Sequence, residues 1–302
     1  MGLIRENVPL APLTYYKIGG PARWFAQPTS LEELGQVADF LASNRMPYFV
    51  LGAGSNVLLD DAGFDGLVLG TTKLDPSLDS SDPSKEVLTV GASVPVIQLL
   101  RACMREGISG FELLVGIPGN MGGVFAMNAG TRLGEIEKAI VELTLYDLAT
   151  KTSRTLPRAR LSYGYRSQRF LGPHELIVGG KLRGTRSEPK KVQDEVQALL
   201  AARKKAQPID KPSCGSVFKN PDPAKGVHAW KVVADVGLRG HRIGGAQVSE
   251  LHTNFIVNLG GATASDVRAL IDEAKARAKD RLGVTLEEEV QIVAHDGGKR
   301  LS

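Results

Sequence analysis

Cysteine is scarce in this chain: only Cys103 and Cys214 occur among 302 residues. Two distant cysteines exclude a disulfide framework, and neither they nor the five histidines have the spacing of a metal site. No apolar run approaches the roughly 18 residues that cross a membrane, and the N-terminus lacks the apolar core of a secretory signal. These absences predict a cytoplasmic protein with reduced thiols, no bound metal and no membrane partner.

A strong charge of one sign is also lacking, since 37 Lys and Arg against 33 Asp and Glu leave a formal net charge of +4. An excess this small, without a block of like charges, does not indicate a nucleic-acid partner. It is compatible with an anionic small substrate and equally with ordinary solubility. The 34 glycines, many of them in tight clusters, are the informative part of the composition.

Local patterns predict a mixture of helices and strands without the regular alternation of a doubly wound sheet, and therefore an α+β fold. Ser30 and Glu33 read as a capping box, Ser93 as a second helix cap, and Gly107 as a helix stop. The polar segment 75–85 is expected to be a surface loop at a domain edge. Helices are expected at 30–44, 93–104, 187–205 and 264–282, and strands at 48–51, 66–69, 87–90, 141–148, 175–182, 255–257 and 290–293.

Two glycine clusters carry the first functional signal. Residues 52–56, GAGSN, follow an expected strand, so that backbone N–H groups and the Ser55 hydroxyl could surround a diphosphate. The third glycine of the Rossmann fingerprint is missing, and a plain tight turn remains open. Residues 116–123, GIPGNMGG, leave little side-chain volume, which suits either a structural loop or a large flat ligand. Two such loops together indicate a dinucleotide.

Three polar clusters carry the second signal. In 163–170, an arginine among tyrosines could hold a carboxylate, although a surface arginine remains the plain alternative. In 212–221, Ser216 could donate a proton and Asn220 could orient a ligand, whereas Cys214 is expected to be a packing residue. This segment is not a GxSxG elbow, which disfavours a hydrolase. In 286–290, strand alternation would turn one of three consecutive glutamates into a cleft, and a solvated edge is the alternative.

Taken in order, seven motifs resemble the UDP-N-acetylenolpyruvoylglucosamine reductase (MurB) family over nearly the whole chain. They are IGGPA (18–22), GAGSN (52–56), GIPGNMGGVFAMNAG (116–130), YGYR (163–166), GSVFKNP (215–221), GGAQVSELHTNFIVN (244–258) and LEEEV (286–290). The resemblance implies an α+β fold with a two-part FAD-binding module of the vanillyl-alcohol-oxidase-like (PCMH-type) kind. FAD-binding subdomains are expected at 1–70 and 71–186, and a C-terminal α+β substrate-binding domain at 187–302.

The implied reaction is the NADPH-driven reduction of UDP-N-acetylglucosamine enolpyruvate to UDP-N-acetylmuramate in peptidoglycan precursor synthesis, with non-covalent FAD. We expect a monomer. An oxidase of the same wider flavin fold and a non-catalytic nucleotide-binding regulator are the alternatives. Both are disfavoured because the serine, arginine and glutamate motifs of the reductase are all present.

The family's site residues transfer by motif position. Arg166 and Glu289 match the pair that stabilises the enol-like intermediate, and Ser216 matches the proton donor; we expect burial to raise the pKa of Glu289. Substrate contacts are expected from Tyr165, Lys219, Asn220 and His252. Cofactor contacts are expected from Gly52, Ala53, Gly54, Ser55, Asn56, Gly116, Ile117, Pro118, Gly119, Gly122, Gly123, Asn128 and Gly130.

The chain departs from the family pattern after its Asn-Ala-Gly triplet. Thr131-Arg132-Leu133-Gly134 stands where many members have Ala-Tyr-Gly-Gly. Either Arg132 supplies the missing tyrosine's substrate contact or the loop is reshaped. The short stretch between Arg166 and Glu175 indicates the shorter family branch, and the spacing leaves open which of Lys204 and Lys205 contacts the substrate.

Overall fold

The computed structural model describes residues 2–82 and 86–297. It divides into two compact units, each assembled from several stretches of chain. Unit 1 comprises Met1–Arg5, Ala26–Ala53 and Val68–Arg203, and unit 2 comprises Glu6–Phe25, Gly54–Leu67 and Lys204–Ser302. Among the described residues, no helix has both the length and the apolar character needed to cross a membrane.

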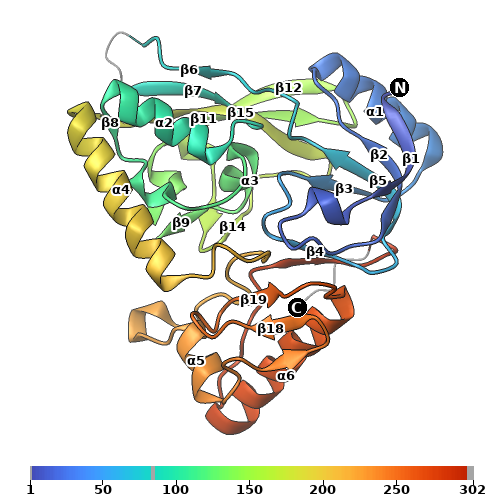
Figure 1. Cartoon of the computed structure of the whole chain (residues 1–302). Helices are drawn as coiled ribbons and strands as arrows, with labels where there is room; N and C mark the ends of the chain where they lie inside the picture. Colours follow the sequence, from blue (N-terminus) through green and yellow to red (C-terminus); the bar gives the residue numbers. More distant parts are fainter. Residues whose placement is uncertain (1, 83–85, 298–302) are drawn as a thin grey trace. The chain divides into compact units, whose positions relative to one another are not determined.

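Unit 1 is built on an antiparallel sheet in the order β12-β11-β15-β7-β6 (Figure 1). Its strands are β6 (Leu78–Asp79), β7 (Val87–Gly91), β11 (Ile140–Asp147), β12 (Thr152–Pro157) and β15 (Glu175–Arg183). Helices α2 (Val96–Glu106), α3 (Met121–Ala126) and α4 (Pro189–Ala206) pack their apolar residues against it in one core. Burying the apolar stripe of each helix on the sheet is the main stabilising term of this unit.

Short elements complete unit 1. Helix α1 (Leu31–Asn44) begins at Ser30, whose hydroxyl accepts a hydrogen bond from the Glu33 backbone N–H. Two-stranded ribbons pair β9 with β10, β13 with β14, and β8 with β16. Their bounds are β8 Ile108–Ser109, β9 Gly130–Thr131, β10 Gly134–Glu135, β13 Tyr163–Gly164, β14 Ser167–Gln168 and β16 Thr185–Arg186.

Unit 2 packs α6 (Ala264–Leu282) and α5 (Ala229–Asp235) around a three-stranded sheet in the order β17-β18-β19 (Figure 1). The strands are β17 (Arg242–Ile243), β18 (Ala246–Val248) and β19 (Ile256–Asn258). Thr263 and Asp266 form a capping box at the start of α6, and Asp61 also accepts its Ala264 and Ser265 N–H groups. Strand β20 (Gln291–Val293) pairs in parallel with β4 (Val57–Leu59).

The N-terminal strands form a four-stranded sheet in the order β1-β2-β5-β3. Their bounds are β1 Ile4–Pro9, β2 Pro21–Ala26, β3 Tyr48–Leu51 and β5 Phe64–Gly70. Five single 3-10 turns lie at Ala11–Leu13, Glu112–Leu114, Ile136–Lys138, Arg158–Arg160 and Pro223–Lys225. The five-stranded sheet of unit 1 and the three-stranded sheet of unit 2 are antiparallel, which confirms the α+β fold class, since a doubly wound fold would be largely parallel.

The bounds of most expected strands and long helices agree with the structure to within one or two residues. The corrections concern single caps, short helices and one loop. Ser93 does not cap α2, because Pro95 is the N-cap and the helix begins at Val96. The Glu33 carboxylate reaches back to Thr29 rather than to Ser30, so the expected reciprocal box is only half formed. The short helices α3 and α5 were not predicted. The expected loop 75–85 contains β6, and its residues 83–85 lie outside the described residues.

Candidate active site

Arg166 is held rigidly in unit 1. It lies in the two-residue turn between β13 and β14, with a φ of 51° that L-residues rarely adopt. Its guanidinium donates to the backbone carbonyls of Gly130, at 2.8 Å, and Asn128, at 3.3 Å, and its side chain is 15% exposed. The Tyr165 ring lies 5.2 Å from the Arg166 guanidinium carbon. The geometry therefore presents a fixed cation beside an aromatic ring.

The Asn128 amide and the Glu135 carboxylate lie beside the Arg166 guanidinium. Asn128 is fully buried, and its side-chain amide donates to Glu135 Oε2 at 3.0 Å and to the Gly164 carbonyl at 3.1 Å. Glu135 Oε1 lies 3.7 Å from Arg166 Nη1. The sequence analysis predicted Asn128 as a cofactor contact and did not identify Glu135, for which no motif gives a signal.

A second arginine lies at the second glycine cluster and was also missed. Arg203 of α4 donates to the Val115 carbonyl at 3.1 Å, and its aliphatic stem passes so close to Gly116 that a Cβ there would lie 2.4 Å from Arg203 Cδ. Burial lowers the pKa of Arg203, and the positive charge of Arg166 lowers this pKa further. Two cations therefore share this region of unit 1, which favours an anionic ligand.

The glycines of the two clusters fall into two kinds. Gly54 has a φ of 70°, and a Cβ there would lie 2.3 Å from the Leu13 carbonyl oxygen, so only glycine fits. At Gly52 and Gly123, in contrast, an added Cβ would meet no described atom within 4 Å. Open space beside a side-chain-free backbone is what close approach of a flat ligand requires. Gly122 and Gly123 lie in helix α3, so the end of the second cluster is helical and not a loop.

In unit 2, Ser216 and Glu289 are tied together through one residue. The Glu289 backbone N–H donates to the Val217 carbonyl at 2.8 Å, and Val217 in turn donates to the Asn254 carbonyl at 2.8 Å. Asn56, from the first glycine cluster, donates through its side chain to the Glu289 carbonyl at 3.0 Å. Ser216 is half-buried, and its hydroxyl makes no hydrogen bond to any residue described here. The hydroxyl is thus available to a ligand.

The neighbours of Ser216 have structural partners. Lys219 forms an ion pair with Glu287, and the Asn220 side-chain oxygen accepts from the Ala229 N–H at the start of α5. Asn254, which the sequence analysis did not single out, binds both backbone groups of Phe218 through its amide. Segment 286–290 makes a single bridge between Glu288 and Phe218 and is not a strand. Its side chains still alternate in exposure, with Glu287 57% and Glu288 11% exposed between the buried Leu286 and Val290. Glu288 instead pairs with Lys275 at 2.7 Å.

Both thiols are buried, which confirms Cys214 as a packing residue. Burial raises the pKa of Cys214 to about 12, and it does the same for Cys103 in unit 1. A nucleophilic cysteine needs a lowered pKa, so nucleophilic catalysis by either thiol is excluded.

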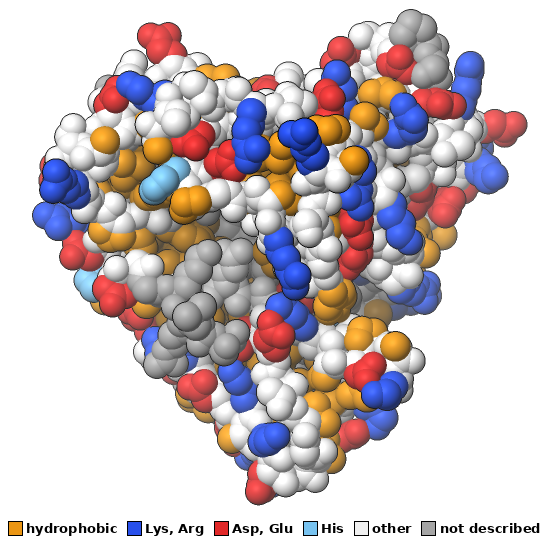
Figure 2. Space-filling view, turned by 180° about the vertical axis from the view of Figure 1, so that it is seen from behind, with side chains coloured by type: hydrophobic (Ala, Val, Ile, Leu, Met, Phe, Trp, Pro, Cys, Tyr) orange, Lys and Arg blue, Asp and Glu red, His pale blue; other side chains and the backbone are white. Residues whose placement is uncertain are grey.

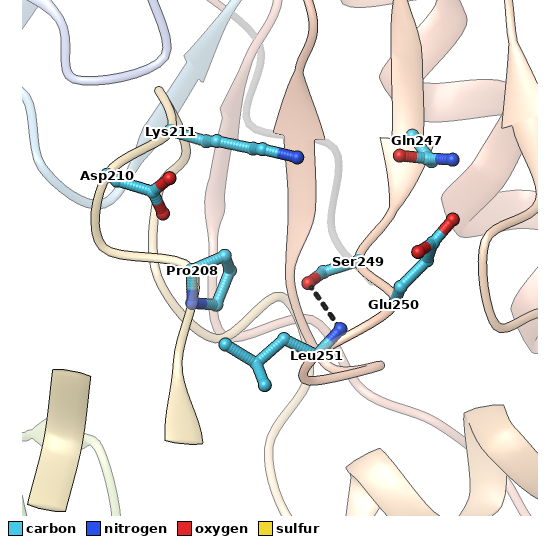
Figure 3. Close-up of a pocket in the computed structure, with 7 residues that line it drawn as sticks. All are labelled: Pro208, Asp210, Lys211, Gln247, Ser249, Glu250 and Leu251. Atoms are coloured by element: carbon cyan, nitrogen blue, oxygen red, sulfur yellow. Dashed lines mark hydrogen bonds between the residues drawn. The ribbon is translucent and has the colours of Figure 1, made fainter. Parts of the chain in front are cut away.

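His252 belongs to an aromatic group in unit 2. Its ring stands edge-on to Phe255, with ring centroids 5.0 Å apart, and 6.5 Å from the ring of Trp230, which is 43% exposed. Figure 3 shows a polar pocket next to this segment. Ser249, within it, accepts a hydrogen bond from the Leu251 N–H at 3.2 Å. The pocket is lined by Pro208, Asp210, Lys211, Gln247, Ser249, Glu250 and Leu251, and contains none of the expected catalytic residues.

The residues expected in the site thus form two groups, each complete within its own unit. Arg166, Tyr165, Asn128 and Gly130 lie together in unit 1, and Ser216, Glu289 and Asn56 lie together in unit 2. On the face drawn in Figure 2, basic and acidic side chains are interspersed. Among the residues that the structure describes, no cluster of His, Cys, Asp and Glu could hold a metal ion.

Known proteins match both parts of the chain. A family model for an FAD binding domain matches residues 22–155, and one for the C-terminal domain of UDP-N-acetylenolpyruvoylglucosamine reductase matches residues 207–293. The reductase of Syntrophotalea carbinolica is 40% identical over 291 residues, covering 96% of this chain and 94% of the relative. The reductase of Geobacter metallireducens is 39% identical over 297 residues, covering 98% of this chain and 95% of the relative.

A solved structure agrees with these sequence matches. The crystal structure of UDP-N-acetylenolpyruvylglucosamine reductase (MurB) from Thermus caldophilus superposes with a TM-score of 0.80 at 32% identity. The match covers 96% of this chain and 99% of that one.

Proposed function

Because this chain belongs to the UDP-N-acetylenolpyruvoylglucosamine reductase family, it reduces UDP-N-acetylglucosamine enolpyruvate to UDP-N-acetylmuramate in peptidoglycan synthesis, and we propose which of its residues do so. It is an oxidoreductase with FAD as cofactor and NADPH as hydride donor. The observation that carries the proposal is the match between this chain and the reductases, which covers nearly the full length of each. All three catalytic side chains of the family's motifs, Arg166, Ser216 and Glu289, are present.

The residues present fit an FAD. The open space at Gly52 and Gly123 and the left-handed backbone at Gly54 are features of a loop that lets a ligand approach the main chain. Backbone N–H groups of 52–56 and the Ser55 hydroxyl would hold the diphosphate, and the segment 116–130 would line the flat ring system. When bound, FAD accepts hydride from NADPH and supplies it to the substrate's double bond.

Arg166 stabilises the charge that develops in the reaction. Hydride adds to the terminal methylene carbon of the enolpyruvyl ether, and the π electrons move to the carbon next to the carboxylate. A cation fixed beside that carboxylate interacts more strongly with this transition state than with the ground state. Two bonds from the Arg166 guanidinium to the carbonyls of Gly130 and Asn128 hold it in place for this role.

Ser216 completes the addition by giving its hydroxyl proton to the carbon next to the carboxylate, and it regains a proton from solvent. A serine is a weak acid, so this transfer depends on close positioning. Glu289 assists as a hydrogen-bonding partner of the enol-like intermediate, which requires its carboxyl to be protonated and its pKa therefore to be raised. The shared hydrogen bond through Val217 supports these joint roles because it couples the two backbones.

Tyr165, Lys219, Asn220 and His252 are the proposed substrate contacts. Lys219 would exchange its Glu287 partner for a substrate phosphate, since both are anions. The Asn220 side-chain oxygen accepts from the Ala229 N–H at the start of α5, which orients the amide for the proposed contact. In the loop that lacks the family tyrosine, Arg132 supplies the substrate contact, and Lys204 or Lys205 adds a basic one.

We further propose a division of labour along the chain. Residues 1–70 and 71–186 would act as the two FAD-binding subdomains and 187–302 as the substrate-binding domain. The protein would work in the cytoplasm, because its nucleotide-sugar substrate and NADPH are cytoplasmic metabolites, and we propose that it works as a monomer.

Anaerobic spectroscopy tests the function. The purified protein should be yellow, with a flavin absorbance at about 450 nm. NADPH should bleach it, and UDP-N-acetylglucosamine enolpyruvate should restore the colour without oxygen. Restoration by oxygen with an alcohol or sugar as reductant would favour the oxidase alternative, and a colourless protein with no extractable flavin would contradict both.

A further inference from the structure

We propose that Glu135 is a positioning residue for the substrate reaction, holding the Arg166 guanidinium in the orientation that receives the substrate carboxylate. This inference rests on the proposed role of Arg166. Glu135 lies outside every motif that the sequence analysis used, in the short ribbon that replaces the family's tyrosine-bearing loop.

The Glu135 backbone is fixed opposite the carbonyl that holds Arg166. Strands β9 and β10 pair Glu135 with Gly130, and a Cβ on Gly130 would lie 2.7 Å from the Glu135 Cα. The Gly130 carbonyl accepts from Arg166 Nη2 at 2.8 Å. One ribbon therefore carries both the carbonyl and the carboxylate that approach the guanidinium.

The two oxygens of Glu135 have different partners. Oε2 accepts from Asn128 at 3.0 Å, which leaves Oε1 directed at Arg166 Nη1, 3.7 Å away. Asn128 itself cannot turn, because its amide also donates to the Gly164 carbonyl and its oxygen accepts from the Glu137 N–H. The carboxylate is thereby oriented through a fully buried amide, as a group with a positioning role should be.

The Glu135 carboxylate lies near one of two neighbouring positively charged side chains. Arg203 and Arg166 are close enough for the charge of one to lower the pKa of the other. The Arg203 charge repels the Arg166 guanidinium, and Glu135 supplies an attraction from the ribbon side. An ionised Glu135 therefore offsets part of the positive charge of the two arginines.

Glu135 is also a titrating group. Burial raises its pKa, while the charge of Arg166 opposes that rise; Glu137 acts in the raising direction and Lys138 in the lowering one. On acidification Glu135 therefore protonates earlier than an ordinary glutamate. A protonated glutamate resembles a glutamine, which provides a readout that a merely structural role would not produce.

The experiment uses holoenzyme reduced with NADPH, mixed anaerobically with UDP-N-acetylglucosamine enolpyruvate, with flavin reoxidation followed by absorbance. Glu135→Gln should slow reoxidation about tenfold while leaving reduction by NADPH within about twofold. Glu137→Gln is the matched control, since Glu137 lies two residues on and pairs with Arg158 at 2.7 Å. The control should reoxidise within about twofold of wild type. The wild-type to Glu135→Gln rate ratio should fall toward one as the pH is lowered.

Two further arms separate this inference from the proposed function. Glu135→Gln should add no further loss to Arg166→Gln, because both act through one group. Binding of UDP-N-acetylglucosamine, which has no carboxylate, should be unchanged by Glu135→Gln in equilibrium dialysis. A Glu135→Gln rate equal to wild type, additive losses, or a pH-independent ratio would overturn the positioning role. A wild-type rate in Arg166→Gln would instead overturn the proposed role of Arg166 itself.

Discussion

At the scale of single residues, the proposed catalytic groups are positioned by main-chain atoms. Arg166 is held by two carbonyls of the segment 128–130, and Glu289 by the carbonyl that follows Ser216. Main-chain groups cannot rotate away as side chains do, so these contacts hold the Arg166 guanidinium and the Glu289 backbone in place. Single substitutions should therefore change the chemistry without disturbing the fold.

Replacing Ser216 by alanine removes the proposed proton donor. Reoxidation of the reduced flavin by the enolpyruvyl substrate should slow by about 10²- to 10⁴-fold, the usual contribution of a positioned acid. Reduction by NADPH should continue at the wild-type rate, because that half-reaction needs no proton from Ser216. Rapid-mixing absorbance measures both steps, and Ser213→Ala is the control in the same segment. Reoxidation of Ser216→Ala at the wild-type rate would exclude this serine as the donor.

The two buried thiols predict a pH effect on stability. Their folded pKa of about 12 lies above the unfolded value of about 8.5. The stabilisation from keeping them neutral is therefore complete below about pH 8.5 and is lost progressively as the pH rises toward 12. Unfolding in denaturant at a series of alkaline pH values should show this decline.

A thiol reagent provides the companion test. At pH 8 the reagent should modify neither cysteine in the native protein and both cysteines in the unfolded protein. A rapidly reacting thiol in the native state would contradict their burial.

At the scale of elements, α3 shows how a short helix can serve a ligand. Two adjacent glycines on it face different surroundings. A Cβ on Gly122 would lie 3.0 Å from Ala92 Cβ, whereas a Cβ on Gly123 would meet nothing within 4 Å. The first glycine therefore permits helix packing against the sheet, and the second leaves room that we assign to the flavin.

This contrast gives a matched pair of variants. Gly123→Ala should leave the apoprotein as stable as wild type, or more stable by up to about 1 kcal/mol, because alanine favours a helix. The same variant should bind FAD more weakly. Gly122→Ala should lose about 1–3 kcal/mol of stability through overpacking. Denaturant unfolding of the apoprotein and FAD titration separate the two effects, and full FAD affinity in Gly123→Ala would contradict the assigned space.

At the scale of the whole molecule, the chain returns repeatedly to each unit. Unit 2 combines residues 6–25 and 54–67 with the C-terminal third, and β20 pairs in parallel with β4 across more than two hundred intervening residues. Such long-range pairings can form only once distant segments have met. A ligand that binds only this folded arrangement stabilises it by mass action, so we expect the stability of the molecule to depend on FAD.

Removing FAD tests this dependence. Flavin-free protein should unfold at a lower temperature than holoenzyme, and FAD at about 100 times its dissociation constant should restore about 2.7 kcal/mol of stability. Thermal unfolding followed by circular dichroism measures the shift. Riboflavin, which lacks the diphosphate, is the control and should restore less. Equal effects of FAD and riboflavin would contradict diphosphate binding by the segment 52–56.

The sequence by itself determined the long helices, several of the core strands and the family. Strands such as 48–51 and the helix ended by Gly283 are specified by local signals, because apolar periodicity and caps involve only neighbouring residues. The catalytic residues could be identified for a related reason, since their motifs are short and continuous. Short helices such as α5 were not predicted, because one or two helical turns contain too few residues to show an apolar periodicity.

Only the tertiary structure decided what surrounds those residues. Glu135, Arg203 and Asn254 lie 31, 37 and 38 residues from Arg166 or Ser216, with no pattern connecting them in the chain. The charge balance at Arg166 depends on a carboxylate and a second guanidinium that come from separate elements. Electrostatic forces act through space rather than along the chain, so folding alone determines which charges meet.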